Sequence, residues 1–396
     1  MPWYDKSKSQ IVMLGGRRSG KSTILSSIVE SIKKTDGNLF TVLGSDVTVD
    51  NRGGLGVPLE YKRRELAGFM VPDPTRQGPF IVDMSSNQGR SIYTITIRRG
   101  NNADATFDFL DVPGEDMQQM IITEDKDTNT KIQVRNPNYD DLNDKMASTD
   151  VVIIAIDTPY LMEALEDVNR IYNRIDEIEG LTNSMIARND KDKKMIILCP
   201  VKCEKWINNG RIEEVTQRTL MAYRNVINAH VQDPNFEIWI MPLATAGGIE
   251  SYKLLPGYQF QEIEGDADTI KTGSIDPITG QIYSPEGRIL SENEVFRIDK
   301  TRQAKELKFD DYLYVPLSWY RTNGSGYSPQ FCEQPAYHII RFLARKKHDN
   351  PNLFGRFFNF FGNHLQKYLD MIDEMERKNM IKTSGDGFYQ VRNIIQ

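Results

Sequence analysis

The sequence is poor in cysteine, histidine, basic excess and long apolar runs, and each shortage excludes a class of protein. Its three cysteines and four histidines have neither the spacing of a zinc site nor that of a disulfide framework. No apolar run approaches the roughly 18–20 residues that cross a bilayer, and the first residues lack the basic and apolar regions of a secretory signal. The net charge is −6, so no basic face is expected to bind nucleic acid. We therefore expect a cytoplasmic protein with reduced thiols and no transmembrane segment.

Short apolar runs alternate with amphipathic stretches along most of the chain, which predicts an α/β fold. The runs predict strands over 10–14, 91–98, 106–111, 151–156, 195–199 and 238–241, and helical spacing predicts helices over 20–34, 59–69, 160–187 and 211–231. The turn at 100–102 joins two of these strands as an antiparallel hairpin. Most of the other strands are followed by a helix, which is typical of a parallel sheet covered on both faces. We expect a three-layer sandwich with a mostly parallel sheet and one antiparallel edge hairpin.

Residues 15–22 join the first predicted strand to the first predicted helix. Glycines in such a turn let successive backbone N–H groups point at phosphate oxygens, and the start of the helix adds partial positive charge. Lys21 is expected to bridge the β- and γ-phosphates, Ser22 to ligate Mg²⁺, and Thr23 to reach the α-phosphate. The segment fits the phosphate-binding pattern G-x-x-x-x-G-K-[ST] and consists of Gly15, Gly16, Arg17, Arg18, Ser19, Gly20, Lys21 and Ser22.

A second motif, Asp-Val-Pro-Gly, occupies 111–114 at the end of a predicted strand. Asp111 at this position can hold Mg²⁺ directly or through a water, and the Gly114 N–H can contact the γ-phosphate. The order of the two motifs predicts a nucleoside-triphosphate site at one edge of the sheet.

A P-loop followed by two strands and Asp-x-x-Gly resembles the translation-factor-related (TRAFAC) class of P-loop GTPases. The resemblance covers residues 8–248 and the helix after Pro335. The form Asp-Val-Pro-Gly-Glu at 111–115, the long polar segment before it and the overall length are similar to the bacterial double-GTPase-type conflict-system proteins. The resemblance implies Mg²⁺-dependent binding and hydrolysis of GTP, a switch that a partner protein detects, and a role in bacterial defence.

The resemblance also implies a threonine that completes the Mg²⁺ shell from the segment before the second strand. Thr75, in Val-Pro-Asp-Pro-Thr, is the best candidate because the prolines would hold it in an exposed loop. Thr41 and Thr48 are rivals.

The base of the nucleotide is less well specified. The class reads guanine with Asn-Lys-x-Asp, whereas this chain has Val-Lys-Cys-Glu at 201–204. Lys202 can lay its stem over the base and Glu204 can accept from the guanine ring. The missing Asn and the longer Glu leave the choice between GTP and ATP open. Thr245 and Ala246 resemble the final base-contacting loop of the class, whose backbone amide would meet the guanine oxygen.

Three charged residues are candidates for catalysis. Glu115 stands where many relatives have a glutamine that orients water, and it could polarise water if its charge is offset. Arg17 or Arg18 could act as a built-in arginine finger, a device capable of about 10³–10⁵ in rate. Equally, both arginines could point to solvent or bind an acidic group of a partner. A slow or partner-activated GTPase is therefore expected.

These expectations divide the chain into four parts: a P-loop GTPase domain at 1–249 with insertions at 37–90 and 115–147, a loop- and β-rich insertion at 250–331, a helix at 332–348 that returns to the GTPase domain, and an amphipathic helix and tail at 349–396. The aromatic stripe of the last part is predicted to pack on the domain and not on a membrane, because acidic residues beside it oppose anionic lipid. A protein partner is expected to bind the insertions. Two other functions stay open: an ATP-using P-loop enzyme, and a non-hydrolysing module whose assembly nucleotide drives.

Overall fold

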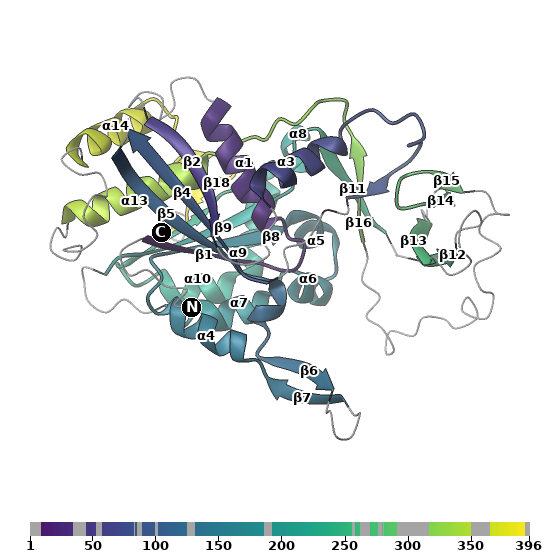
Figure 1. Ribbon diagram of the computed structural model, residues 1–396, viewed down its shortest axis with the longest axis horizontal. Coiled ribbons are helices and arrows are strands. Elements are labelled where there is room, and N and C mark those ends of the chain that lie inside the picture. Colours follow the sequence, from purple (N-terminus) through teal and green to yellow (C-terminus); the bar gives the residue numbers. More distant parts are fainter. Residues whose placement is uncertain are drawn as a thin grey trace.

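The structure is a computed structural model, and it describes residues 9–34, 45–52, 58–82, 84, 89–99, 102–124, 131–185, 192–255, 258–261, 270–275, 279, 281–290, 317–349 and 365–392. Its main element is a nine-stranded sheet (Figure 1). In order across the sheet, the strands are β17 (Ser384–Gly385), β18 (Phe388–Gln390), β10 (Phe236–Ile240), β9 (Lys194–Val201), β8 (Val151–Asp157), β1 (Ser9–Leu14), β5 (Asn102–Asp111), β4 (Ser91–Arg99) and β2 (Ser45–Arg52).

The five central strands, from β10 to β5, are parallel, as the alternation of strands and helices predicts. β4 and β5 form the predicted antiparallel hairpin. β2 adds to β4 at one edge, and the β17–β18 hairpin adds to β10 at the other; the sequence did not predict these strands. Met13 of β1 lies opposite Asp111 of β5, and Leu14 lies opposite Ile154 of β8. The carboxyl ends of the central strands therefore meet at one edge of the sheet.

Alternate residues of β1 point to opposite faces of the sheet and enter two separate cores. Ile11 and Met13 pack with α1 (Lys21–Lys34), α13 (Gln334–Asp349) and α14 (Leu365–Arg377). Val12 and Leu14 pack with α4 (Pro137–Met146) and other helices of the opposite face. Figure 1 shows these two layers of helices on either side of the strands. The chain thus has the mixed α/β architecture that its periodicity predicts.

The single helix predicted over 160–187 is wrong. The chain forms three short helices there, α5 (Thr158–Glu163), α6 (Glu166–Tyr172) and α7 (Ile175–Thr182). Leu165 is extended, and Arg174 has a left-handed backbone with φ 53°. Between them, the Asn173 side chain accepts from the Asp157 N–H at 2.7 Å and donates to the Asp157 carbonyl at 3.2 Å. This tertiary contact at the end of β8 competes with a continuous helix.

The helix predicted over 211–231 is also divided, into α9 (Ile212–Ala222) and α10 (Arg224–His230). The short helix predicted over 59–69 is α3 (Leu59–Gly68).

The segments predicted to be irregular contain further strands. β3 (Phe80–Ile81) pairs with β16 (Leu317–Thr322), and β16 pairs with β11 (Ile249–Leu255), so the segment before β4 forms one sheet with the segment after β10. A hairpin of β6 (Met120–Glu124) and β7 (Lys131–Arg135) projects from the body of the molecule (Figure 1). A four-stranded sheet consists of β12 (Tyr258–Gln261), β13 (Ile270–Ile275), β14 (Ile282–Tyr283) and β15 (Ile289–Leu290).

The carboxyl-terminal helix α14 folds back on the sheet, as its periodicity predicts. Tyr368, Ile372 and Met375 are buried against α13 in the first core. The predicted aromatic stripe begins at Phe354, and its members up to Phe361 lie outside the described residues.

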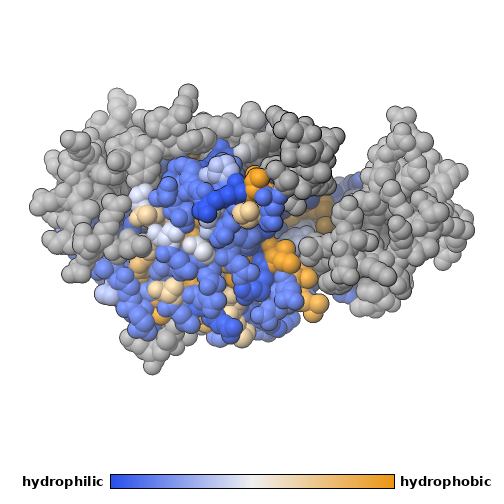
Figure 2. Space-filling view, turned by 90° about the horizontal axis from the view of Figure 1, so that it is seen from below, coloured by the Kyte–Doolittle hydropathy of each residue, from blue (hydrophilic) through white to orange (hydrophobic). Residues whose placement is uncertain are grey.

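No helix in the described part of the chain has both the length and the apolar character needed to cross a membrane. The face turned downward in Figure 1 carries mostly hydrophilic side chains, and its apolar ones form small groups (Figure 2).

Candidate functional site

The predicted phosphate loop connects β1 to α1 at the carboxyl edge of the sheet. The loop ends in a helix start, because the Gly20 carbonyl accepts from the Ile24 N–H at 2.8 Å. On its other side the loop packs on the break between α6 and α7. A Cβ atom at Gly16 would lie 1.9 Å from the Tyr172 carbonyl oxygen, so only glycine fits at this position. The loop also packs closely on β8, because a Cβ atom at Gly15 would lie 2.6 Å from the Ala155 carbonyl oxygen.

Lys21 turns back over this loop. Its ammonium donates to the carbonyls of Gly15 and Gly16, each at 2.9 Å, and its residue is only 8% exposed. Burial lowers the pKa of Lys21, against the attraction of Asp111 and Glu115. A buried cation is therefore fixed where the phosphate-binding pattern predicts one.

Ser22 and Asp111 come from different motifs and meet directly. The Ser22 hydroxyl donates to Asp111 Oδ2 at 2.6 Å. One hydroxyl and one carboxylate are hard oxygen ligands of the kind that Mg²⁺ accepts together with phosphate oxygens and waters. No cluster of three or more metal-binding side chains occurs among the described residues, so a metal here would depend on the nucleotide for further ligands. The two residues fit the predicted Mg²⁺ site.

Gly114 makes the second contact between the motifs. A Cβ atom there would lie 2.8 Å from the Arg17 backbone nitrogen, too close for any side chain. At Gly114, the turn after β5, a short 3₁₀ helix over Gly114–Met117, therefore meets the phosphate loop backbone to backbone. Because the two backbones are in close contact, a movement of one loop would displace the other.

These residues line one cavity of about 200 Å³. The walls bring together most of the residues that the sequence singles out, namely Arg17, Arg18, Gly20, Lys21, Ser22, Thr23, Asp111, Gly114, Glu115, Lys202, Glu204, Thr245 and Ala246. Gly15, Gly16 and Ser19 belong to the same loop, and the Ser19 side chain is buried beside Gly15. The sequence did not predict the remaining lining residues Lys62, Leu66, Val82, Met84, Gly89, Pro113, Ile249 and Tyr320.

Thr75 does not join the cavity. Its hydroxyl donates to Asp73 Oδ1 at 2.6 Å, and its N–H donates to the same oxygen at 2.9 Å. The aspartate two residues before it supplies a local acceptor, which fixes an exposed turn. Of the rivals, Thr48 lies in the edge strand β2 and Thr41 lies outside the described residues.

Arg17 and Glu115 face each other across the two loops. Their charged groups lie 3.6 Å apart, and their side chains are 65% and 55% exposed. Such an exposed pair contributes little stability, about 0–1 kcal/mol. Either side chain can therefore leave the other when a third charge enters the cavity.

Lys202 is hydrogen-bonded to the phosphate loop. It has a left-handed backbone with φ 61°, and its ammonium forms an ion pair with Asp157 at 2.5 Å and donates to the Arg18 carbonyl at 3.1 Å. Burial opposes the charge, but Asp157 raises the pKa of Lys202. Lys202 thus links β9, β8 and the phosphate loop.

Glu204 is hydrogen-bonded to the loop around Ala246, which was expected to contact the base. Its Oε1 accepts from the N–H groups of Ala246 at 2.7 Å and Gly247 at 3.2 Å, and the residue is 3% exposed. Burial raises the pKa of Glu204, against these two N–H groups. The loop is also tied to α1, because the Ser27 hydroxyl donates to the Thr245 carbonyl at 2.8 Å. The Ala246 amide expected to meet the guanine oxygen therefore donates to Glu204.

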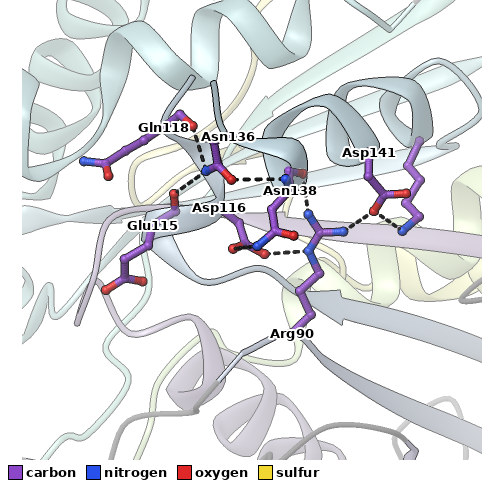
Figure 3. Close-up of polar contacts among 8 residues, drawn as sticks. Arg90, Glu115, Asp116, Gln118, Asn136, Asn138 and Asp141 are labelled. Atoms are coloured by element: carbon purple, nitrogen blue, oxygen red, sulfur yellow. Dashed lines mark hydrogen bonds and ion pairs between the residues drawn. The ribbon is translucent and has the colours of Figure 1, made fainter. Parts of the chain in front are cut away.

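A buried polar network, which the sequence did not predict, holds the turn after Gly114 (Figure 3). Arg90 is 8% exposed, and its guanidinium donates to Asp116 at 2.6 Å, to Asp141 and to the Asn138 carbonyl. Asn138 also donates to Asp116 at 2.9 Å. The turn is thereby joined to α4 and to the residue before β4.

Asn136 completes this connection from the end of β7. Its side-chain amide donates to the carbonyls of Glu115 at 3.1 Å and Gln118 at 2.8 Å (Figure 3). Its oxygen caps α4 by accepting from the Asn138 N–H at 3.1 Å. The projecting β6–β7 hairpin and α4 are therefore bonded to the segment that contacts the phosphate loop.

Comparisons with known proteins add little to this geometry. No protein-family model and no curated protein matches the sequence. Among solved structures, the chain is similar to the GTPase-like domain of S. cerevisiae Ski7 bound to GTP, with a TM-score of 0.32 and 15% identity over 60% of this chain. The match covers 43% of that chain, less than half of its length. A likeness at this level does not establish a function for this chain.

Proposed function

We propose that the protein binds GTP with Mg²⁺ in this cavity, hydrolyses it, and acts as a nucleotide-dependent switch for a protein partner. The observation that carries the proposal is the convergence of Lys21, Ser22, Asp111 and Gly114 on one cavity, although the two motifs are about ninety residues apart in the sequence. A glycine turn alone would not need a carboxylate from another strand in contact with its serine.

Each residue has a role that its position supports. Lys21 leaves the carbonyls of its own loop and binds the β- and γ-phosphates. Ser22 and Asp111 would hold Mg²⁺, which would supply positive charge to offset that of the transferring phosphoryl group. The Gly114 N–H donates to the γ-phosphate, and Glu115 orients the attacking water.

The Arg17–Glu115 pair supports slow or partner-activated hydrolysis. While the two side chains are paired, each offsets the charge of the other, so Arg17 is less available to the phosphates and Glu115 is less available to a water. A partner that separates the pair would release both groups, and Arg18 provides a second cation at the same rim.

ATP is the second candidate nucleotide. It stays a candidate because Glu204, the residue expected to recognise guanine, is already hydrogen-bonded within the protein. The carboxylate oxygen that would accept from guanine accepts instead from Ala246 and Gly247. Guanine selectivity requires Glu204 to exchange these bonds for bonds to the base. If that exchange does not occur, the cavity binds both nucleotides with similar affinity.

A switch function is supported by the network around Arg90 and Asn136. Binding of the γ-phosphate at Gly114 would move the turn over Gly114–Met117, and that turn is bonded to α4 and the β6–β7 hairpin. We infer that a partner detects the nucleotide on this side of the molecule. A role in bacterial defence stays a prediction from the sequence resemblance.

The test begins with the nucleotide in freshly purified protein, released by denaturation and identified by chromatography. Phosphate release is then measured with GTP and with ATP, with and without Mg²⁺. We expect Mg²⁺-dependent turnover of GTP that is reduced in Ser22→Ala. Turnover should be retained in Ser148→Ala, which removes a hydroxyl that does not line the cavity and donates to the Lys145 carbonyl at the end of α4. Binding of neither nucleotide by the wild-type protein would overturn the proposal.

A further inference from the structure

Helix α3 forms one wall of the cavity and lies beside α1 (Figure 1). Its first residue, Leu59, accepts a hydrogen bond from the Ser26 hydroxyl of α1 at 3.2 Å. Further along, Leu66 packs in a small apolar cluster with Ala246, Ile249 and Tyr320. The helix is therefore fixed both to the helix that follows the phosphate loop and to the loop near Glu204.

The buried face of α3 contains a charged residue, Lys62, between two apolar ones. Its buried positions are Leu59, Lys62 and Leu66, with the spacing of one helix face. Three other charges of the helix are paired with one another, since Arg63 and Arg64 bind Glu60. Lysine is almost never fully buried without a partner. Lys62 is nevertheless only 5% exposed.

Lys62 lines the cavity together with Lys21, Ser22 and Asp111. No ion pair within 4.0 Å joins it to another residue of the described ranges. Burial lowers the pKa of Lys62, against the weaker attraction of Glu65 and Asp111. Burial therefore removes water from the ammonium, and the protein only partly replaces the lost electrostatic stabilisation. An anion bound in the cavity would supply the rest.

We propose that Lys62 is a second phosphate-binding cation, which binds the γ-phosphate together with Lys21. The inference rests on the proposed function and extends it. The γ-phosphate is the group expected between Lys21 and the Asp111–Gly114 segment, and Asp111 is one of the two carboxylates that attract Lys62. Binding would hold α3 over the triphosphate, whereas a diphosphate would lack the group that Lys62 contacts. Lys62 would thus distinguish GTP from GDP.

The experiment measures the affinity of fluorescent GTP and GDP analogues for full-length protein at fixed Mg²⁺. Lys62→Met keeps the length of the side chain and removes its charge. We expect it to weaken GTP binding about tenfold or more, since a charge-assisted hydrogen bond is lost, and to change GDP binding less than about twofold. Arg64→Gln removes a positive charge from the exposed face of the same helix and should change neither affinity.

A folding measurement accompanies the titrations. Replacing a buried, poorly compensated charge by an apolar side chain of similar volume is often neutral or stabilising, so Lys62→Met should unfold at the same urea concentration as the wild type or a higher one. If Lys62→Met does not fold, Lys62→Gln provides the same comparison with a polar side chain.

Three results would overturn the inference. Unchanged GTP affinity in Lys62→Met would show that Lys62 does not bind the nucleotide. Equal losses for GTP and GDP would show a structural role for the residue. In a separate Mg²⁺ titration of Lys62→Met, a higher Mg²⁺ affinity together with unchanged GTP affinity would show that Lys62 only neutralises Asp111. Failure of the wild-type protein to bind any nucleotide would instead contradict the proposed function as a whole.

Discussion

Replacement of Gly114 by alanine tests whether the two motifs act as one unit. The added Cβ would lie 2.8 Å from the Arg17 nitrogen and 3.3 Å from the Gly16 carbonyl carbon, and both are backbone atoms that cannot rotate away. Forcing an extra methyl into a close-packed contact costs about 1–3 kcal/mol, or about 5- to 150-fold in an equilibrium constant. The turn after β5 must therefore retreat from the phosphate loop.

We expect this retreat to weaken GTP binding more than GDP binding, because the Gly114 N–H is proposed to contact only the γ-phosphate. The affinities of both nucleotides would be measured by fluorescence titration, and the free energy of unfolding by urea denaturation. Gly68→Ala is the matched control: a Cβ there meets nothing within 4 Å, and alanine stabilises a helix by about 0.5–1 kcal/mol relative to glycine. The reasoning is refuted if Gly114→Ala keeps both the wild-type unfolding free energy and the wild-type ratio of GTP to GDP affinity.

Three further predictions follow from buried ionisable side chains. Arg90→Met leaves Asp116 without its buried partner, so the free energy of unfolding in urea should fall by about 3–5 kcal/mol, whereas Arg135→Met, which removes an exposed pair, should leave it nearly unchanged. Burial lowers the pKa of Lys21 and a bound triphosphate favours its charged form, so GTP affinity should fall as the pH rises toward the ordinary lysine value of 10.5; a flat titration up to that pH would contradict this. Burial lowers the pKa of His338 well below 6.5, so the unfolded chain takes up a proton first and stability should decrease as the pH falls through 6.5; this part of the slope should disappear in His338→Gln.

The parts of the fold that the sequence predicts are those set by local pattern. The apolar run before Gly15 and the helical spacing after Gly20 place the phosphate loop between β1 and α1. The Asp111 motif follows the predicted hairpin β4–β5. These features need no knowledge of distant contacts, because periodicity and glycine position specify them.

The parts that the sequence does not predict depend on contacts between distant segments. The break between α6 and α7 depends on Asn173 bonding to the end of β8. Thr75 is drawn into a local turn by Asp73, which propensity alone does not weigh against a metal. Lys62 resembles an ordinary helix-surface lysine until α3 is packed on α1. Its spacing from Leu59 and Leu66 is the one signal in the sequence that could have indicated burial.

The most direct test of the account is the affinity of GTP·Mg²⁺ for wild-type protein and for Lys21→Ala, measured by calorimetric titration alongside urea unfolding. The account predicts binding to the wild type and a loss of about 2–5 kcal/mol in the variant, at least about 30-fold in affinity, since a buried charge contact to phosphate is removed. The variant should remain folded, because in the described part of the chain the hydrogen bonds of the Lys21 ammonium go to two carbonyls of its own loop. Equal affinity of the two proteins for GTP would contradict the central claim that this loop binds a triphosphate.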